Sequence, residues 1–366
     1  MGVTSGEQGF VRGDTGIESV GSLAFGPGDV LFVADSKRAK VVAIDVADPS
    51  TEAATGPFDL SDVDRALAGY LGCDAADVAI RDLSVHPRTG NVYLSVTRGA
   101  GDAGQPVLIR VDRAEGTISD VDLHDVSFSE ADLVDAPAAD DPRQDFHLGE
   151  GEWHEFGDRK IQIARVPVRL SAVTDLAYVD GAVLVAGMSN EEFSSTFRRI
   201  PFPFTGEHAS TGLEIFHVAH GQWETAAPIR TFLPYQDGTS ILASYTCTPL
   251  VHFPMTDLQA GGHAKGRTVA ELGAGNQPLD IVSFQQDGAE HLLVSHTTHP
   301  LMKIACADID KQDGLTHPQE PRGVPRTLPD LTGVSLMANL DGDHILALQA
   351  DDSGVRNLRT LKTASL

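Results

Sequence analysis

A short apolar run that stops at a tight polar turn, with a second apolar run directly after it, recurs six times along this chain. Turns such as Gly26-Pro27-Gly28 and Asp180-Gly181 join two strand-length runs, a pattern typical of β-hairpins. Hairpins that repeat at intervals of tens of residues indicate a propeller or a solenoid. The six copies lie at 22–35, 82–95, 175–186, 229–245, 281–295 and 334–348.

A third apolar run follows each hairpin, which supplies three inner strands of a four-stranded blade. These third runs lie at 41–45, 107–112, 197–201, 250–254, 301–305 and 355–361. Weakly alternating candidates for the outer, solvent-facing strand lie at 117–123, 213–219 and 267–272. We therefore predict an all-β fold, a six-bladed β-propeller, with a seven-bladed propeller as the alternative. Residues 1–366 would form one domain, closed by pairing of its terminal segments.

Two insertions, at 60–78 and 124–160, interrupt the repeat. In the first, apolar residues at helical spacing follow Ser61, a plausible cap, so we predict one amphipathic helix over 61–77. The second is long and acidic and has no clear periodicity, which indicates a surface excursion. A hairpin hidden there would raise the blade count to seven.

The net charge of -25 arises from 52 acidic and 27 basic residues. Such a chain repels phosphates, so nucleic acids and anionic membranes are poor partners, whereas cations and basic proteins fit better. The alternative interpretation is that the excess of acidic residues only keeps the surface solvated. No apolar stretch approaches the roughly 18 residues that a membrane span needs, so we expect a soluble chain without membrane insertion.

The three cysteines, Cys73, Cys247 and Cys306, show no C-x-x-C spacing, so at most one disulfide bridge is expected and a structural zinc site of paired cysteines is not. The N-terminal residues 1–6 have neither the basic region nor the apolar core of a secretory leader. Two interpretations stay open: a cytoplasmic protein, or a leader that is not part of this sequence.

The turns of a propeller alternate between the two ends of its central channel. The hairpin turns, rich in glycine, gather at one end and are assigned no chemistry. The other end collects the starts of the inner strands, where Asp82, Asp175 and Asp280 lie, and the links to each third strand. These aspartates either cap strands by accepting hydrogen bonds from backbone amides, or form a carboxylate ring. Such a ring could hold a divalent cation such as calcium or act as acid or base.

The links add further polar groups to the same end of the channel, and we predict that Asn190, Cys247 and His296 join the three aspartates in one ligand-binding site. Cys247 is either a small buried apolar side chain or a reactive thiol or soft-metal ligand. The second role needs a histidine from another blade beside it.

Two His-x-x-His pairs occur, His217 with His220 and His296 with His299. Residues three apart on a strand point to opposite faces, so either pair can share a metal only if the chain turns between them. Surface or hydrogen-bonding histidines are the alternative. The aspartate-rich segment 308–314 misses the EF-hand pattern, and the sequence contains no nucleophile elbow, phosphate loop or dinucleotide fingerprint. Whether the protein is an enzyme stays open.

The repeat resembles the broad bacterial propeller group that includes the YVTN, NHL and lactonase-type propellers. Segments 187–193, 200–204 and 245–250 are also similar to uncharacterised, exported bacterial propellers. The resemblance implies the fold and an extracytoplasmic location, and brings no known activity. Lactonase-type propellers hold a divalent ion with Glu, Asn and Asp on the channel floor. Asn190 and Asp280 could correspond, but Glu18 is the sole glutamate near the start of a first inner strand.

Three hypotheses for function follow. The first is a binding module that holds a small molecule, a metal ion or a protein segment in its central funnel. The second is a metal-dependent hydrolase of lactonase type, in which the ion polarises a carbonyl and a carboxylate is the base. The third is an interaction scaffold whose acidic rim holds a basic protein partner.

Overall fold

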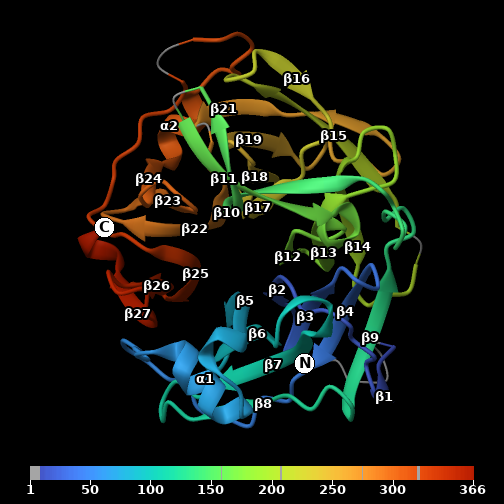
Figure 1. Ribbon diagram of the computed structural model, residues 1–366, viewed down its shortest axis with the longest axis vertical. Helices are drawn as coiled ribbons and strands as arrows, with labels where there is room; N and C mark the ends of the chain where they lie inside the picture. The colour runs from blue at the N-terminus through green and yellow to red at the C-terminus, as the bar shows by residue number, and fades with distance from the viewer. Residues whose placement is uncertain (1–8, 158, 207, 274, 320–321) are drawn as a thin grey trace.

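Six β-sheets stand around a common axis in the computed structural model, which describes residues 9–157, 159–206, 208–273, 275–319 and 322–366 (Figure 1). The predicted six-bladed propeller is confirmed within these ranges. Blades are numbered here in the chain order of their first hairpins. The region enclosed by their innermost strands is called the central channel.

The first three blades hold the following strands. Blade 1 contains β2 (Leu23–Phe25), β3 (Val30–Asp35), β4 (Lys40–Asp45), β9 (Val126–Asp132) and β1 (Val11–Gly13). Blade 2 contains β5 (Val78–Val85), β6 (Val92–Arg98), β7 (Gln105–Val111) and β8 (Ile118–Asp120). Blade 3 contains β12 (Asp175–Val179), β13 (Ala182–Met188), β14 (Ser195–Pro201), β15 (Ser210–His217), β16 (Gln222–Glu224) and β20 (His263–Lys265).

The other three blades and the helices complete the fold. Blade 4 contains β17 (Ile229–Tyr235), β18 (Ser240–Tyr245), β19 (Pro249–Pro254) and β21 (Arg267–Glu271). Blade 5 contains β22 (Pro278–Gln286), β23 (Ala289–His296) and β24 (Met302–Ala305), and blade 6 contains β25 (Val334–Asp341), β26 (His344–Ala350) and β27 (Arg356–Lys362). The α-helices are α1 (Val63–Leu71) and α2 (Cys306–Lys311).

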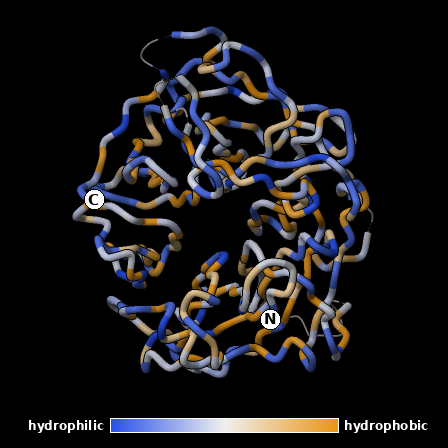
Figure 2. Tube along the Cα trace, in the orientation of Figure 1, coloured by the Kyte–Doolittle hydropathy of each residue, from blue (hydrophilic) through white to orange (hydrophobic). Residues whose placement is uncertain are grey.

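The middle strands carry the core. β3, β13 and β18 are buried at every residue, because neighbouring blades cover both faces of each sheet. Figure 2 shows apolar segments along the blades and polar residues in many of the connections. Each pair of neighbouring blades shares one apolar cluster, so the core consists of six wedges between blades.

The blades do not follow the chain order around the ring. Phe32 of blade 1 and Val183 of blade 3 belong to one apolar cluster, and Leu94 of blade 2 and Leu346 of blade 6 belong to another. Blade 2 therefore stands between blades 6 and 1, and the ring order is 2, 1, 3, 4, 5, 6 (Figure 1). To reach blade 3, the chain passes back over blade 1 and forms its fourth strand, β9, on the way.

Ring closure differs from the predicted pairing of the two termini. β1 pairs with β9 inside blade 1, and the edge of blade 6 is covered by the segment before α1. The backbone amides of Leu60 and Leu358 each donate to the other residue's carbonyl oxygen, at 2.9 Å. This segment comes from the link between blades 1 and 2, and blade 2 is the ring neighbour of blade 6.

Residues 124–160 are not the predicted irregular excursion. They contain β9 and most of a long hairpin of β10 (Gln144–Phe156) and β11 (Arg159–Pro167). β9 escaped notice because its buried and exposed residues alternate only weakly. The β10–β11 hairpin is a separate two-stranded sheet rather than a blade, so the count of six stands.

The predicted helix is present but shorter than residues 61–77. α1 begins after Asp62, whose φ of 50° and missing side-chain cap bond exclude the predicted Ser61 cap. It ends at Gly72, which has a left-handed φ of 67° that favours glycine. A short 3-10 turn, Ala75–Asp77, follows. Val63 and Leu67 anchor α1 in the cluster between blades 2 and 6.

No helix among the described residues is long and apolar enough to cross a membrane.

The inserted helix should contribute to the stability of the ring. Leu67 is fully buried between blades 2 and 6, so Leu67→Ala should lower the free energy of unfolding in urea by about 2–5 kcal/mol. Leu328→Ala is the control, because Leu328 is 58% exposed. Equal effects of the two substitutions would contradict the packing described here.

Candidate functional site

Three aspartates connect inner strands of neighbouring blades. The backbone amide of Leu23 donates to Asp82 Oδ2 at 2.7 Å, that of Phe232 to Asp175 Oδ2 at 2.8 Å, and that of Met337 to Asp280 Oδ2 at 2.5 Å. These hydrogen bonds join blade 2 to blade 1, blade 3 to blade 4, and blade 5 to blade 6. The predicted capping of backbone amides is thus present, and it acts between blades rather than only along one strand.

Local backbone irregularities place these side chains. The strand register shifts between Ile80 and Asp82 and between Pro278 and Asp280, while Asp175 begins β12. The Oδ1 atom of each aspartate accepts the amide of the following residue, at 2.7–2.8 Å. Each aspartate is half-buried, so water has only limited access to its carboxylate.

The three carboxylates influence one another. The Ser22 hydroxyl donates to Asp175 Oδ1 at 2.8 Å and also interacts with Asp82, so these two carboxylates lie close together. Burial, and then the charge of Asp175, raise the pKa of Asp82 to about 7. Burial raises the pKa of Asp175 to about 6. Burial and the charge of Asp82 raise the pKa of Asp280 well above its ordinary value.

The three carboxylates do not form one compact set of metal-ligand atoms. Calcium–oxygen bonds of about 2.3–2.6 Å require ligand atoms within about 5 Å of one another. Among the described residues, the three aspartates are not a set of ligand atoms that all lie within 4.8 Å.

Of the other predicted site residues, Asn190 and Cys247 lie on links, and His296 is the last residue of β23. Asn190 is exposed, and its backbone amide donates to the Asp135 carbonyl oxygen at 2.8 Å. His296 is buried, and burial lowers its pKa to about 4. In the described chain, no hydrogen bond or ion pair joins Asn190, Cys247 or His296 to the aspartates. A shared ligand site for these six residues therefore stays a prediction.

The β10–β11 hairpin lies on the link end of blades 4 and 5. Arg230 of β17 donates to both oxygens of Asp145 at 2.7 Å, and the amide of Leu148 donates to Gln277 Oε1 at 3.1 Å. Figure 1 shows its strands near those of blade 4. A hairpin in this region was only the alternative prediction, and the sequence signal for it is the alternation of apolar and polar residues in 160–167.

Cys247 lies in the link between β18 and β19 and has a left-handed φ of 62°. Burial raises the pKa of its thiol, so the isolated side chain is a poor nucleophile. The histidine neighbours that its chemistry requires come from blade 3, namely His217 and His220. The sequence could not reveal that these histidines lie near Cys247, because their proximity depends on how blades 3 and 4 pack.

Comparison with known proteins identifies no family. No protein-family model and no curated protein matches the chain. Solved structures similar in shape include the mitotic checkpoint complex, at 11% identity over 97% of this chain and 91% of that chain, with a TM-score of 0.40. A structure described as a glucose dehydrogenase from Thermus thermophilus has 14% identity over 96% and 99%, with a TM-score of 0.36.

A further similar structure is the PQQ-bound aldose sugar dehydrogenase from Streptomyces coelicolor, at 11% identity over 96% of both chains and a TM-score of 0.33. Since these TM-scores lie below 0.5, the propeller assignment rests on the six sheets of this chain and not on these similarities.

The aspartates should make stability depend on pH in a defined direction. At Asp82, the folded state binds more protons than the unfolded state between the ordinary aspartate pKa of 3.8 and the Asp82 pKa of about 7, and Asp175 and Asp280 shift in the same direction. The contribution of these groups to the free energy of unfolding must therefore fall as pH rises through this window. We expect the difference in unfolding free energy between the wild type and Asp82→Asn/Asp280→Asn to shrink from about pH 4 to about pH 7.

Urea unfolding of both proteins at several pH values measures this difference. Because the histidines titrate in both proteins, their contribution to the free energy of unfolding cancels in this difference. A difference that stays constant with pH would show that these carboxylates ionise as ordinary aspartates.

Proposed function

We propose that this propeller is a binding module whose ligand is a cation held in the central channel by Asp82, Asp175 and Asp280. The proposal rests on three half-buried carboxylates whose negative charges repel one another. No ion pair to any of the three is present among the described residues. A bound cation would replace the protons that the raised pKa values otherwise retain.

The chemistry of the site defines the ligand class. Each carboxylate already accepts hydrogen bonds from two backbone amides. Its remaining lone pairs would therefore bind a cation with moderate strength. Oxygen ligands suit hard cations such as calcium, and an alkylammonium group is the alternative cation. The net charge of -25 adds a long-range field that attracts such ligands at low salt.

The lactonase-type hydrolase and the acidic scaffold stay as predictions. Asn190 lies on an exposed link without a contact to Asp280 in the described chain, so no observation favours the hydrolase's Glu, Asn and Asp ligand set. The scaffold rests on charge alone, and a basic partner would be displaced by high salt.

Titration calorimetry with calcium chloride and with propylammonium chloride tests the proposal. We expect saturable binding of one of the two at about pH 8, and at least tenfold weaker binding at about pH 5, where protons compete for the carboxylates. Asp82→Asn/Asp280→Asn should abolish binding.

The matched control is Asp237→Asn/Asp287→Asn, which changes the net charge equally in hairpin turns assigned to the opposite end of the channel. Both residues have a positive φ that asparagine adopts readily, so this variant should fold and bind normally. Binding that survives in the channel variant, or is lost equally in both variants, would refute the proposed site.

A further inference from the structure

Two histidines, a cysteine and two glutamates meet where the outer edges of blades 3 and 4 adjoin. This edge cluster consists of His217, His220, Glu224, Cys247 and Glu271. β15 ends at His217, and the chain turns at once, since the amides of His220 and Gly221 donate to the His217 carbonyl oxygen. The turn fulfils the condition for a shared metal and leaves the two imidazole ring centres 3.8 Å apart.

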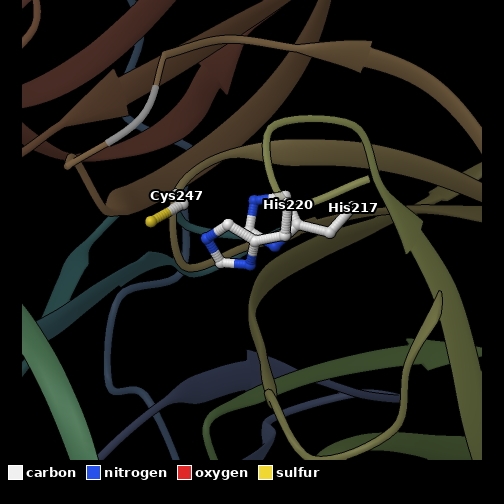
Figure 3. Close-up of side chains that lie close together, drawn as sticks. All are labelled: His217, His220 and Cys247. Carbon is white, nitrogen blue, oxygen red and sulfur yellow. The ribbon is translucent and has the colours of Figure 1, made fainter. Parts of the chain in front are cut away.

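The cysteine thiol completes a compact set of ligand atoms. One ligand atom each from His217, His220 and Cys247 all lie within 4.8 Å of one another (Figure 3). Around a tetrahedral zinc ion, nitrogen and sulfur ligands lie about 3.3–3.8 Å apart. In the described chain this is the one group of three such residues that meets the distance limit. Small side-chain movements would therefore suffice to close it around an ion.

Glu224 orients both imidazoles. Its Oε2 lies 3.0 Å from His217 Nδ1 and its Oε1 lies 2.5 Å from His220 Nδ1. One carboxylate thus holds the Nδ1 atoms of both rings, which leaves both Nε2 atoms to face other partners. Metal-binding histidines have this arrangement, because a carboxylate on Nδ1–H fixes the ring and makes Nε2 a better ligand.

Two buried polar atoms at the centre of the edge cluster lack hydrogen bonds. His217 Nε2 and Glu271 Oε1 are 3.0 Å apart, yet neither has a hydrogen-bond partner of acceptable geometry among the described residues. Their residues are only 3% and 2% exposed. Unsatisfied polar atoms at such depth are costly, and a metal ion bound to both would satisfy them.

We propose that the edge cluster is a transition-metal site, with His217, His220 and Cys247 as ligands and zinc as the ion. The Glu271 carboxylate, 3.0 Å from His217 Nε2, would move to become the fourth ligand. Imidazole and thiolate ligands select zinc-like ions over calcium and magnesium, which prefer oxygen. Four protein ligands fill a tetrahedral shell, which is typical of structural sites. Since two ligands come from each blade, the ion would clamp blade 3 to blade 4.

An alternative occupant of this position is a proton. Burial lowers the pKa of His217, but the adjacent carboxylates of Glu224 and Glu271 outweigh burial and raise it to about 9. A metal-free chain would then carry an imidazolium between two carboxylates. Such an ion-pair network binds no metal, so metal binding separates the two explanations.

Cobalt(II) is the probe, added to the full chain after chelator treatment and reduction of the thiols. We expect one equivalent to produce a sulfur-to-cobalt charge-transfer absorption that zinc abolishes by displacement. Cys247→Ser should remove this band, whereas the matched substitutions Cys73→Ser and Cys306→Ser should leave it. Glu224→Gln should retain the band with about 10–100-fold weaker binding.

Two further controls separate metal binding at the edge cluster from a loss of folding and from binding in the channel. His220 is half-exposed, so His220→Gln should fold, which circular dichroism checks, and should lose the rise in melting temperature that zinc gives the wild type. Asp82→Asn/Asp280→Asn should keep the cobalt band, which separates this site from the channel. No cobalt band, or a band that survives in Cys247→Ser, would overturn the proposal.

Discussion

The hydrogen bonds between inner strands are the constraint on which this propeller depends. A strand that lines the channel exposes backbone amides at its wall, and an amide without an acceptor is costly there. Asp82, Asp175 and Asp280 supply acceptors across the boundary to the next blade. Tying the blades in this way gathers three negative charges around one axis. The same interaction that joins the blades therefore creates a region suited to a cation.

The ring closes by exchange of outer strands rather than by a seam between the termini. Blade 1 receives β9 after blade 2 is complete, and blade 6 is covered by the segment around Leu60. Both additions come from the chain around blade 2, which thereby stands between blades 6 and 1. The β10–β11 hairpin then carries the chain towards blade 3 and is fixed by the buried pair of Arg230 and Asp145. The two crossing segments thus hold the first two blades in an order that the chain sequence alone would not give.

Sequence analysis found what local chemistry determines. Apolar runs joined by glycine turns gave all six hairpins, and aspartates before inner strands gave the three carboxylates. It missed β9, because an outer strand is specified by its partner more than by its own alternation. One funnel site for Cys247, His296 and the aspartates stays a prediction, and the sequence did not indicate that Cys247 lies within 4.8 Å of ring nitrogens of His217 and His220. That approach depends on packing between blades 3 and 4, which no local sequence pattern encodes. The capping role of the aspartates was foreseen, but not that the capped amides belong to the neighbouring blade.

The most direct test of the central claim is a crystal structure of the protein soaked in barium chloride at about pH 8, phased to show anomalous scattering. Barium resembles calcium in its oxygen ligands and is located unambiguously by its anomalous signal. The account predicts one anomalous peak on the ring axis, in reach of Asp82, Asp175 and Asp280 either directly or through one water layer. A map in which these carboxylates lie far apart, or in which the axis holds only water while barium occupies the outer surface, would contradict it.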